Sequence, residues 1–204
     1  ELVEVDGSSP DSFLAGARDA DALLTSWGIK IDQQIIAGLE KCAVIGVGSV
    51  GVDMVDVDAA TEAGIVVTNV PDVFIEEVAD HTLMLLLACA RRSKLMDKMV
   101  NEGKWYKGRP ILEQIPRLWG QTLGLISFGN VATAVARRAK PFGLNVIAYD
   151  PYVTELKMTA EGVQPVNLPE LYEKSDYISI HPGLNDTSRA MLNDDAFAAM
   201  KNTV

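Results

Sequence analysis

Two glycine-containing loops could bind phosphate, and the first is a formal match to a known pattern. Gly46, Gly48 and Gly51 spell G-x-G-x-x-G directly after an apolar run. Such a loop must open into a helix whose free N–H groups meet a pyrophosphate, and the next strand should end in an acidic residue. Here residues 52–56 make a poor first helical turn, and the next apolar run ends in Thr68 and Asn69. We therefore do not expect a dinucleotide at this loop.

The second loop, Ser127 to Ala132, is degenerate as a pattern but has the required context. An apolar strand at Leu123–Ile126 precedes it, and a helix over Val131–Lys140 follows. The next strand, Asn145–Tyr149, ends in Asp150, about 20 residues beyond the central glycine of the loop, where a carboxylate can accept hydrogen bonds from ribose hydroxyls. This spacing predicts an NAD site. A β-α-β turn without a ligand remains the alternative.

Single residues of the second loop refine this prediction. Gly129 lets the backbone approach a pyrophosphate, and Ala132 is small enough for close helix packing. Ser127 stands where the first glycine is expected. If the turn needs a positive φ there, a serine costs on the order of 1–2 kcal/mol. The residues expected to contact the dinucleotide here are Ser127, Phe128, Gly129, Asn130, Val131 and Asp150.

Short Val- and Ile-rich runs alternate with amphipathic stretches along the chain, which predicts an α/β fold with parallel sheets. In the first third we expect four strands and three helices. The strands are Glu1–Val5, Ala22–Leu24, Ala43–Ile45 and Ile65–Thr68; the helices are Asp11–Arg18 and two that begin after the N-caps Asp32 and Asp56. Later elements are a short helix at Leu168–Lys174 and a strand at Tyr177–His181.

A long helix over Ile75–Arg92 marks a domain boundary, which divides the chain into residues 1–74 and 75–204. The following stretch, Ser93–Gly120, is polar and contains glycine and proline, so we expect an irregular arm. Its Trp105 and Trp119 suggest a surface for a partner protein.

Composition excludes some classes of function. A net charge of −10 disfavours binding to nucleic acid, which needs clustered Lys and Arg. Cys42 and Cys89 lie in apolar runs, which suits buried free thiols in a reducing compartment such as the cytoplasm. No apolar run is long enough to span a bilayer. Two histidines and two cysteines, scattered along the chain, give no metal-site spacing.

The two histidines are in different settings. His81 lies among leucines of the long helix, so packing or a hydrogen bond is its expected role. His181 ends a strand at the carboxyl edge of the sheet, where ligands bind, so a role beside the cofactor and a structural role are both open.

Several motifs occur together in one order. They are Val50-Gly51-Val52-Asp53, Asn69-Val70-Pro71, Glu77-Val78-Ala79-Asp80-His81, Tyr149-Asp150-Pro151-Tyr152 and His181-Pro182-Gly183-Leu184-Asn185. With them, nearly the whole chain resembles the D-isomer-specific 2-hydroxyacid dehydrogenases, the family of phosphoglycerate dehydrogenase, and within it the branch of the C-terminal-binding-protein corepressors. The resemblance implies doubly wound parallel sheets in two domains, both incomplete: residues 1–74 belong to a smaller flavodoxin-like substrate domain, and residues 75–204 to a Rossmann-type NAD-binding domain.

The resemblance also implies roles for individual residues. The loop Ser49, Val50 and Gly51 presents backbone N–H groups to the substrate carboxylate. Phe74 borders the substrate and nicotinamide, and Val78 faces the nicotinamide. The adenine and ribose side is implied for Pro151, Tyr152, His181, Pro182, Gly183 and Asn185.

The implied activity is reversible hydride transfer between NAD and a small 2-hydroxy or 2-keto acid. The arginine, glutamate and histidine that act catalytically in the family are expected beyond Val204, with both ends of the chain clipped and residues 202–204 entering a strand. The helix and arm at residues 75–120 imply a homodimer. An alternative is an NAD-binding, corepressor-like interaction protein without turnover, which unusual residues at Val47, Ser49, Met54 and Ser127 slightly favour.

Overall fold

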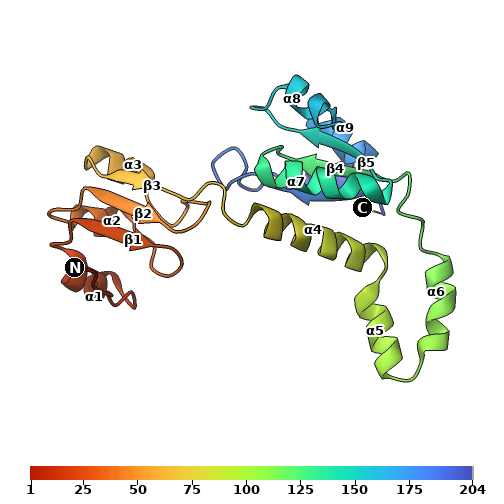
Figure 1. Cartoon of the computed structure of the whole chain (residues 1–204), viewed down its shortest axis with the longest axis horizontal. Helices are drawn as coiled ribbons and strands as arrows, with labels where there is room; N and C mark the ends of the chain where they lie inside the picture. The colour runs from red at the N-terminus through yellow and green to blue at the C-terminus, as the bar shows by residue number, and fades with distance from the viewer. Residues whose placement is uncertain (204) are drawn as a thin grey trace. The chain divides into compact units, whose positions relative to one another are not determined.

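The computed structural model describes residues 1–203, and the chain forms two compact units, Glu1–Val73 and Phe74–Val204 (Figure 1). Every strand pairing within them is parallel, which confirms the α/β prediction. Of the expected final strand, Asn202 and Thr203 lie in a turn, and Val204 is outside the described residues.

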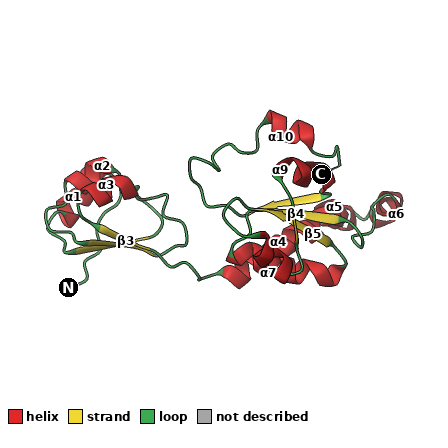
Figure 2. Ribbon diagram, turned by 90° about the horizontal axis from the view of Figure 1, so that it is seen from above, coloured by secondary structure: helices red, strands yellow, loops and turns green. Residues whose placement is uncertain are grey.

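Unit 1 is a three-stranded sheet with its helices on one face (Figure 2). The strands run in the order β1 (Ala22–Thr25), β2 (Val44–Val47), β3 (Val66–Thr68), and the helices are α1 (Pro10–Ala17), α2 (Gln33–Ala37) and α3 (Val57–Glu62). Asp32 and Asp56 cap α2 and α3 as predicted, each accepting a hydrogen bond from a backbone N–H three residues on. The core between helices and sheet includes the fully buried Ile35 and Ile45.

The expected strand at Glu1–Val5 is wrong, because this segment forms no ladder with the sheet. Leu2 and Val3 are 91% and 63% exposed, and only Val5 packs against the core. A strand register is fixed where one face is buried, and here neither alternating set of side chains is buried.

Unit 2 is a doubly wound sheet with helices on both faces. Its strands run in the order β6 (Gln164–Pro165), β5 (Asn145–Tyr149), β4 (Thr122–Ile126), β7 (Tyr177–Ile180). One face is covered by α4 (Ile75–Ala90) and α7 (Asn130–Ala139), and the other by α9 (Leu168–Lys174) and α10 (Asp194–Ala199) (Figure 2). Unit 2 also contains the short segments α8 (Glu155–Ala160) and η2 (Lys140–Phe142). This arrangement of strands and helices is the predicted Rossmann-type architecture.

The arm is helical, so the predicted irregular structure is wrong. It contains α5 (Ser93–Asn101), η1 (Trp105–Gly108) and α6 (Arg109–Glu113) (Figure 1). Pro110 lies in the first turn of α6, where its missing N–H removes no helical hydrogen bond. Gly108 is buried, and a Cβ there would lie 3.0 Å from the Met96 sulfur, so this glycine allows close packing rather than breaking structure.

Two further expectations concern exposure. Trp105 and Trp119 are 69% and 76% exposed, which confirms their surface position. The expected burial of the cysteines holds only in part: Cys42 is partly buried and packs against the core of unit 1, whereas Cys89 on α4 is exposed. Among residues 1–203, no helix has the length and apolar character needed to cross a membrane.

Candidate functional site

The loop from β4 to α7 leads directly into a helix, as predicted. Gly129 is the N-cap of α7, and no side chain caps the helix, so N–H groups of its first turn are left for a ligand. A Cβ at Gly129 would meet nothing within 4 Å, so open space lies in front of the loop. Ala132 is fully buried in the core beneath. The loop therefore offers partial positive charge and room for an anionic group.

Asp150 directly follows β5, and its carboxylate lies against the β4–α7 loop. Its Oδ2 accepts hydrogen bonds from Ser127 Oγ at 3.0 Å and from the Phe128 N–H at 2.8 Å. Its Oδ1 accepts from the N–H groups of Tyr152 and Val153 at 2.8 and 3.1 Å. Partial burial raises the pKa of the carboxyl, but the hydrogen bonds together lower it more, so the net pKa lies below its usual value. Asp150 is therefore ionised at neutral pH.

Ser127 has a φ of 70°, in the left-handed region, so the condition under which a serine at the first glycine position is costly is met. Of the residues that follow Asp150, Tyr152 is 78% exposed and Pro151 is also exposed. The backbone N–H of Tyr152 donates to Asp150, whereas the Tyr152 ring is exposed to solvent.

The carboxyl end of β7 lies beside that of β4, because His181 N–H donates to the Ile126 carbonyl at 2.9 Å. The His181 ring is partly buried, its Nε2 lies 2.9 Å from Ser179 Oγ, and burial lowers its pKa to about 4. The imidazole is therefore neutral at physiological pH. This position brings His181 to the same sheet edge as the loop.

Beyond His181 the chain forms a tight turn and a small apolar pocket. Asn185 Oδ1 accepts from the N–H groups of Thr187 and Ser188, so this amide closes the turn. Ser188 Oγ donates to the Gly183 carbonyl at 2.7 Å. A pocket of about 290 Å³ opens here and is lined by Ile180, Pro182, Leu184, Ser188, Ala190, Met191 and Leu192.

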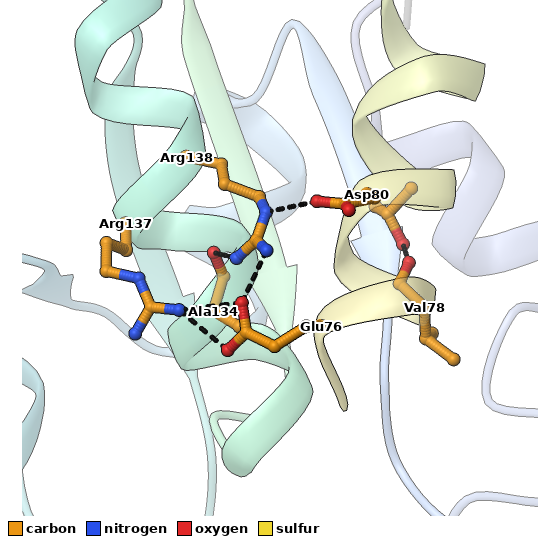
Figure 3. Close-up of polar contacts among 7 residues, drawn as sticks. Glu76, Val78, Asp80, Ala134, Arg137 and Arg138 are labelled. Carbon is orange, nitrogen blue, oxygen red and sulfur yellow. Dashed lines mark hydrogen bonds and ion pairs between the residues drawn. The ribbon is translucent and has the colours of Figure 1, made fainter. Parts of the chain in front are cut away.

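An ion-pair cluster fixes the start of α4 against α7 (Figure 3). Arg138 Nε lies 2.6 Å from Asp80 Oδ1, Arg137 lies 2.7 Å from Glu76 Oε1, and Arg138 also pairs with Glu76. The hydrogen bonds from Arg138 and Arg137 lower the pKa of Glu76, and those from Glu76 and Asp80 raise that of Arg138. The cluster thereby links the first two turns of α4 to the last turn of α7.

Glu76 was not among the residues predicted from the sequence. Its partners come from α7, and the adjacent Arg137 and Arg138 were the available signal. Val78 is 46% exposed and points away from the ion pairs (Figure 3). Phe74, directly before α4, is 59% exposed with a φ of 64°. His81 is exposed on α4, which contradicts a packing role; a hydrogen bond, the other expected role, stays a prediction.

In unit 1, the formal G-x-G-x-x-G loop does not lead directly into a helix, as the poor first helical turn at residues 52–56 predicted. β2 ends at Val47, and α3 begins only at Val57. Ser49 Oγ donates to the Gly51 carbonyl at 2.7 Å, and Asn69 Nδ2 donates to the Val50 carbonyl at 2.8 Å. Asn69 was not among the predicted site residues; its place directly after β3 at the carboxyl edge was the signal. Its hydrogen bond to the Val50 carbonyl ties this loop to the end of β3.

Within residues 1–203, no group of three or more His, Cys, Asp or Glu side chains has an arrangement that could hold a metal ion.

Comparison with known proteins gives one consistent family. The family model for the D-isomer specific 2-hydroxyacid dehydrogenase NAD binding domain matches residues 83–204. The chain is 37% identical over 202 residues to a D-3-phosphoglycerate dehydrogenase of Methanocaldococcus jannaschii, covering 98% of this chain and 38% of that protein. It is 36% identical over 198 residues to a hydroxypyruvate reductase of Thermotoga maritima, covering 95% and 61%.

Solved structures agree. A D-lactate dehydrogenase from Aquifex aeolicus, complexed with NAD and lactic acid, superposes with a TM-score of 0.86 and 28% identity, covering 92% of this chain and 56% of that one. The chain thus spans little more than a third of the phosphoglycerate dehydrogenase and just over half of the lactate dehydrogenase.

Proposed function

The chain belongs to the D-isomer-specific 2-hydroxyacid dehydrogenase family, and from that premise we propose that it is part of an NAD-dependent oxidoreductase acting on the CH–OH group of a D-2-hydroxy acid. Its relatives bear the names phosphoglycerate dehydrogenase, hydroxypyruvate reductase and lactate dehydrogenase. Their differing names leave the identity of the acid open, so the proposal extends to small 2-hydroxy and 2-keto acids as a class.

The observation that carries the proposal is the junction of Asp150 with the β4–α7 loop. An ionised carboxylate lies within hydrogen-bond distance of the Phe128 N–H, directly before an uncapped helix start with open space at Gly129. A pyrophosphate needs the helix start, and a ribose diol needs the carboxylate. The residues present therefore fit NAD, which, when bound, supplies the hydride acceptor for oxidation of the hydroxy acid.

The remaining site residues divide between the two units. We assign the substrate carboxylate to the loop Ser49, Val50 and Gly51 of unit 1, whose backbone is held by Asn69. We also assign Phe74, the first residue of unit 2, to substrate binding. The cofactor side comprises Val78, the loop Ser127, Phe128, Gly129, Asn130 and Val131, and then Asp150, Pro151, Tyr152, His181, Pro182, Gly183 and Asn185. The small pocket lined by Pro182 suits an adenine ring in size and polarity. The catalytic arginine, glutamate and histidine are proposed to lie outside residues 1–204.

We further propose a homodimer that uses residues 75–120, a cytoplasmic location, and no direct contact with nucleic acid. The exposed aromatic rings of Trp105 and Tyr106 on the arm support the first. The free thiols support the second. The net charge of −10 supports the third.

A second candidate function is an NAD-binding interaction protein without turnover. The strained Ser127, inside the cofactor loop itself, is the observation that favours it. The two candidates differ in the parent protein beyond Val204. An arginine, a glutamate and a histidine in family order support the dehydrogenase, and their absence supports the binding protein.

The binding test is a fluorescence titration of the chain with NADH. We expect saturable binding that Glu77→Gln, a matched change of an exposed carboxylate on α4, leaves intact and that Asp150→Arg abolishes. A folded chain that binds no NADH at millimolar concentration would contradict the proposal.

A further inference from the structure

The Asp150 carboxylate has no hydrogen-bonding capacity left over. A carboxylate offers about four lone-pair sites, and four protein donors point at this one. Three are backbone N–H groups, of Phe128, Tyr152 and Val153, whose positions follow from the chain path. The fourth is the Ser127 hydroxyl. It is the one donor that a rotation about χ1 can remove without moving the backbone.

Ser127 is not needed to orient Asp150. The Phe128 N–H holds Oδ2, and the N–H groups of Tyr152 and Val153 hold Oδ1, so both oxygens stay fixed without the hydroxyl. The serine also occupies a φ of 70°, where glycine is unstrained and an L-residue costs about 1–2 kcal/mol. Its hydroxyl therefore adds a hydrogen bond to a carboxylate that is already held.

We infer that the Ser127 hydroxyl is an internal competitor for the Asp150 carboxylate, which a ribose hydroxyl of the dinucleotide has to displace; this rests on the cofactor site proposed above. A glycine at this position would leave one lone pair of Oδ2 open to the ribose. Serine closes it, so the dinucleotide gains one hydrogen bond only by breaking another. The consequence is a site that retains its selectivity for a ribose diol but binds the cofactor more weakly.

The expected size of the effect follows from the bond that is exchanged. A typical hydrogen bond contributes about 0.5–1.5 kcal/mol net, which corresponds to roughly 2- to 12-fold in a dissociation constant. Removing the competitor should tighten NADH binding by roughly 3- to 10-fold. The same removal should raise the pKa of the Asp150 carboxyl in the free protein, because the serine hydrogen bond is among those that lower it.

The experiment measures NADH binding by calorimetry to the whole chain and to five variants. Ser127→Ala removes the hydroxyl and keeps the backbone strain, whereas Ser127→Gly removes both. Thr159→Ala is the control, because it removes a hydroxyl in the same unit that contacts only the Glu155 carbonyl. Asp150→Ala, alone and with Ser127→Ala, completes a double-mutant cycle. Circular dichroism verifies that each variant is folded.

We expect both serine variants to bind NADH 3- to 10-fold more tightly, Thr159→Ala to bind as the parent chain does, and Ser127→Ala to have no effect when Asp150 is absent. Unchanged or weaker binding by folded Ser127→Ala and Ser127→Gly overturns the inference and leaves the dinucleotide site standing. Absence of NADH binding to the folded parent chain overturns both. Carbon-13 titration of the Asp150 carboxyl adds a readout without ligand: a pKa that does not rise in Ser127→Ala shows that the competing hydrogen bond is not made.

Discussion

At the scale of single residues, Asp150 both holds the β4–α7 loop in place and is the proposed acceptor for the ribose hydroxyls. Its two oxygens tie the β4–α7 loop to the turn after β5, so the acceptor for the ribose is also the structural link between two segments. Substitutions of Asp150 will therefore change both binding and stability, and the two effects have to be separated by the choice of variant.

Replacing Asp150 should weaken the preference for NAD over NADP. The carboxylate can accept hydrogen bonds from a ribose 2′-hydroxyl and repels a 2′-phosphate. We expect Asp150→Ala to weaken NADH binding by roughly 10-fold or more, the value of a hydrogen bond to a charged group, when Ser127 is replaced by alanine, and by a smaller factor in the parent chain, where the Ser127 hydroxyl competes; the relative binding of NADPH should improve in both. Dissociation constants for both cofactors test this. Asp150→Asn, which keeps an acceptor but loses the charge, should recover part of the NADH affinity. An undiminished preference for NAD in Asp150→Ala would show that another residue discriminates.

His181 should make the protein less stable in mild acid. Burial lowers its folded pKa to about 4, below the 6.5 of the unfolded chain. The stability that comes from a neutral His181 is therefore present above pH 6.5 and is lost as the pH falls from about 6.5 to about 4. At pH 5.5 the loss should be about 1 kcal/mol. Urea denaturation of the parent chain and of His181→Gln, compared between pH 7.5 and pH 5.5, measures it. Parallel pH profiles for the two proteins would rule out this role.

At the scale of elements, periodicity and context predicted the sheet of unit 2 and the helices packed on it better than the arm. β5 and α9 have the predicted bounds, and α7 begins one residue early, because each is amphipathic or apolar over its full length. The position of Asp150 followed from chain spacing. Its four donors did not, since hydrogen bonds depend on where the backbone N–H groups lie in space. The helices of the arm were missed because Gly108 and Pro110 stand at positions where a helix tolerates them.

The sheet of unit 2 should be sensitive to a single added methyl group at Gly124. A Cβ there would lie 2.2 Å from Ser175 Oγ and 2.8 Å from a Leu171 methyl carbon, so β4 and α9 approach each other only because this residue is glycine. We expect Gly124→Ala to lower the free energy of unfolding by about 1–3 kcal/mol. Chemical denaturation measures the loss. Adding Ser175→Ala removes the nearest atom and should restore part of it; a Gly124→Ala protein as stable as the parent would contradict this packing.

At the scale of the whole molecule, residues 75–120 consist of α4, which packs into the core of unit 2, and an arm that has little core of its own. α4 contributes buried Leu83 and Leu86, whereas α5 and α6 bury no residue fully. An amphipathic arm without its own core is a surface that gains stability by pairing with another chain.

The arm should therefore control oligomeric state. We expect the chain to sediment as a dimer at micromolar concentration, and Trp105→Ser to raise the dimer dissociation constant at least 10-fold, as is typical for a central aromatic residue of an interface. Trp27→Ser is the matched control, because Trp27 is 84% exposed in unit 1 and outside the arm. A monomeric parent chain, or equal effects of the two substitutions, would argue against an interface here.

The last prediction concerns activity. Because residues 1–204 are proposed to contain the binding site but not the catalytic residues, they should bind NADH without turning it over. The proposed site within them orients a dinucleotide and a carboxylate, and His181, the histidine at the sheet edge, is neutral with its Nε2 beside Ser179. Positive charge on the developing alkoxide and a proton donor each typically contribute a factor of 10² or more, so without both no turnover should be measurable. An NADH-consumption assay with glyoxylate, pyruvate and hydroxypyruvate tests this. Turnover that Asp150→Arg abolishes would place the catalytic residues inside this chain, with His181 the first to be examined.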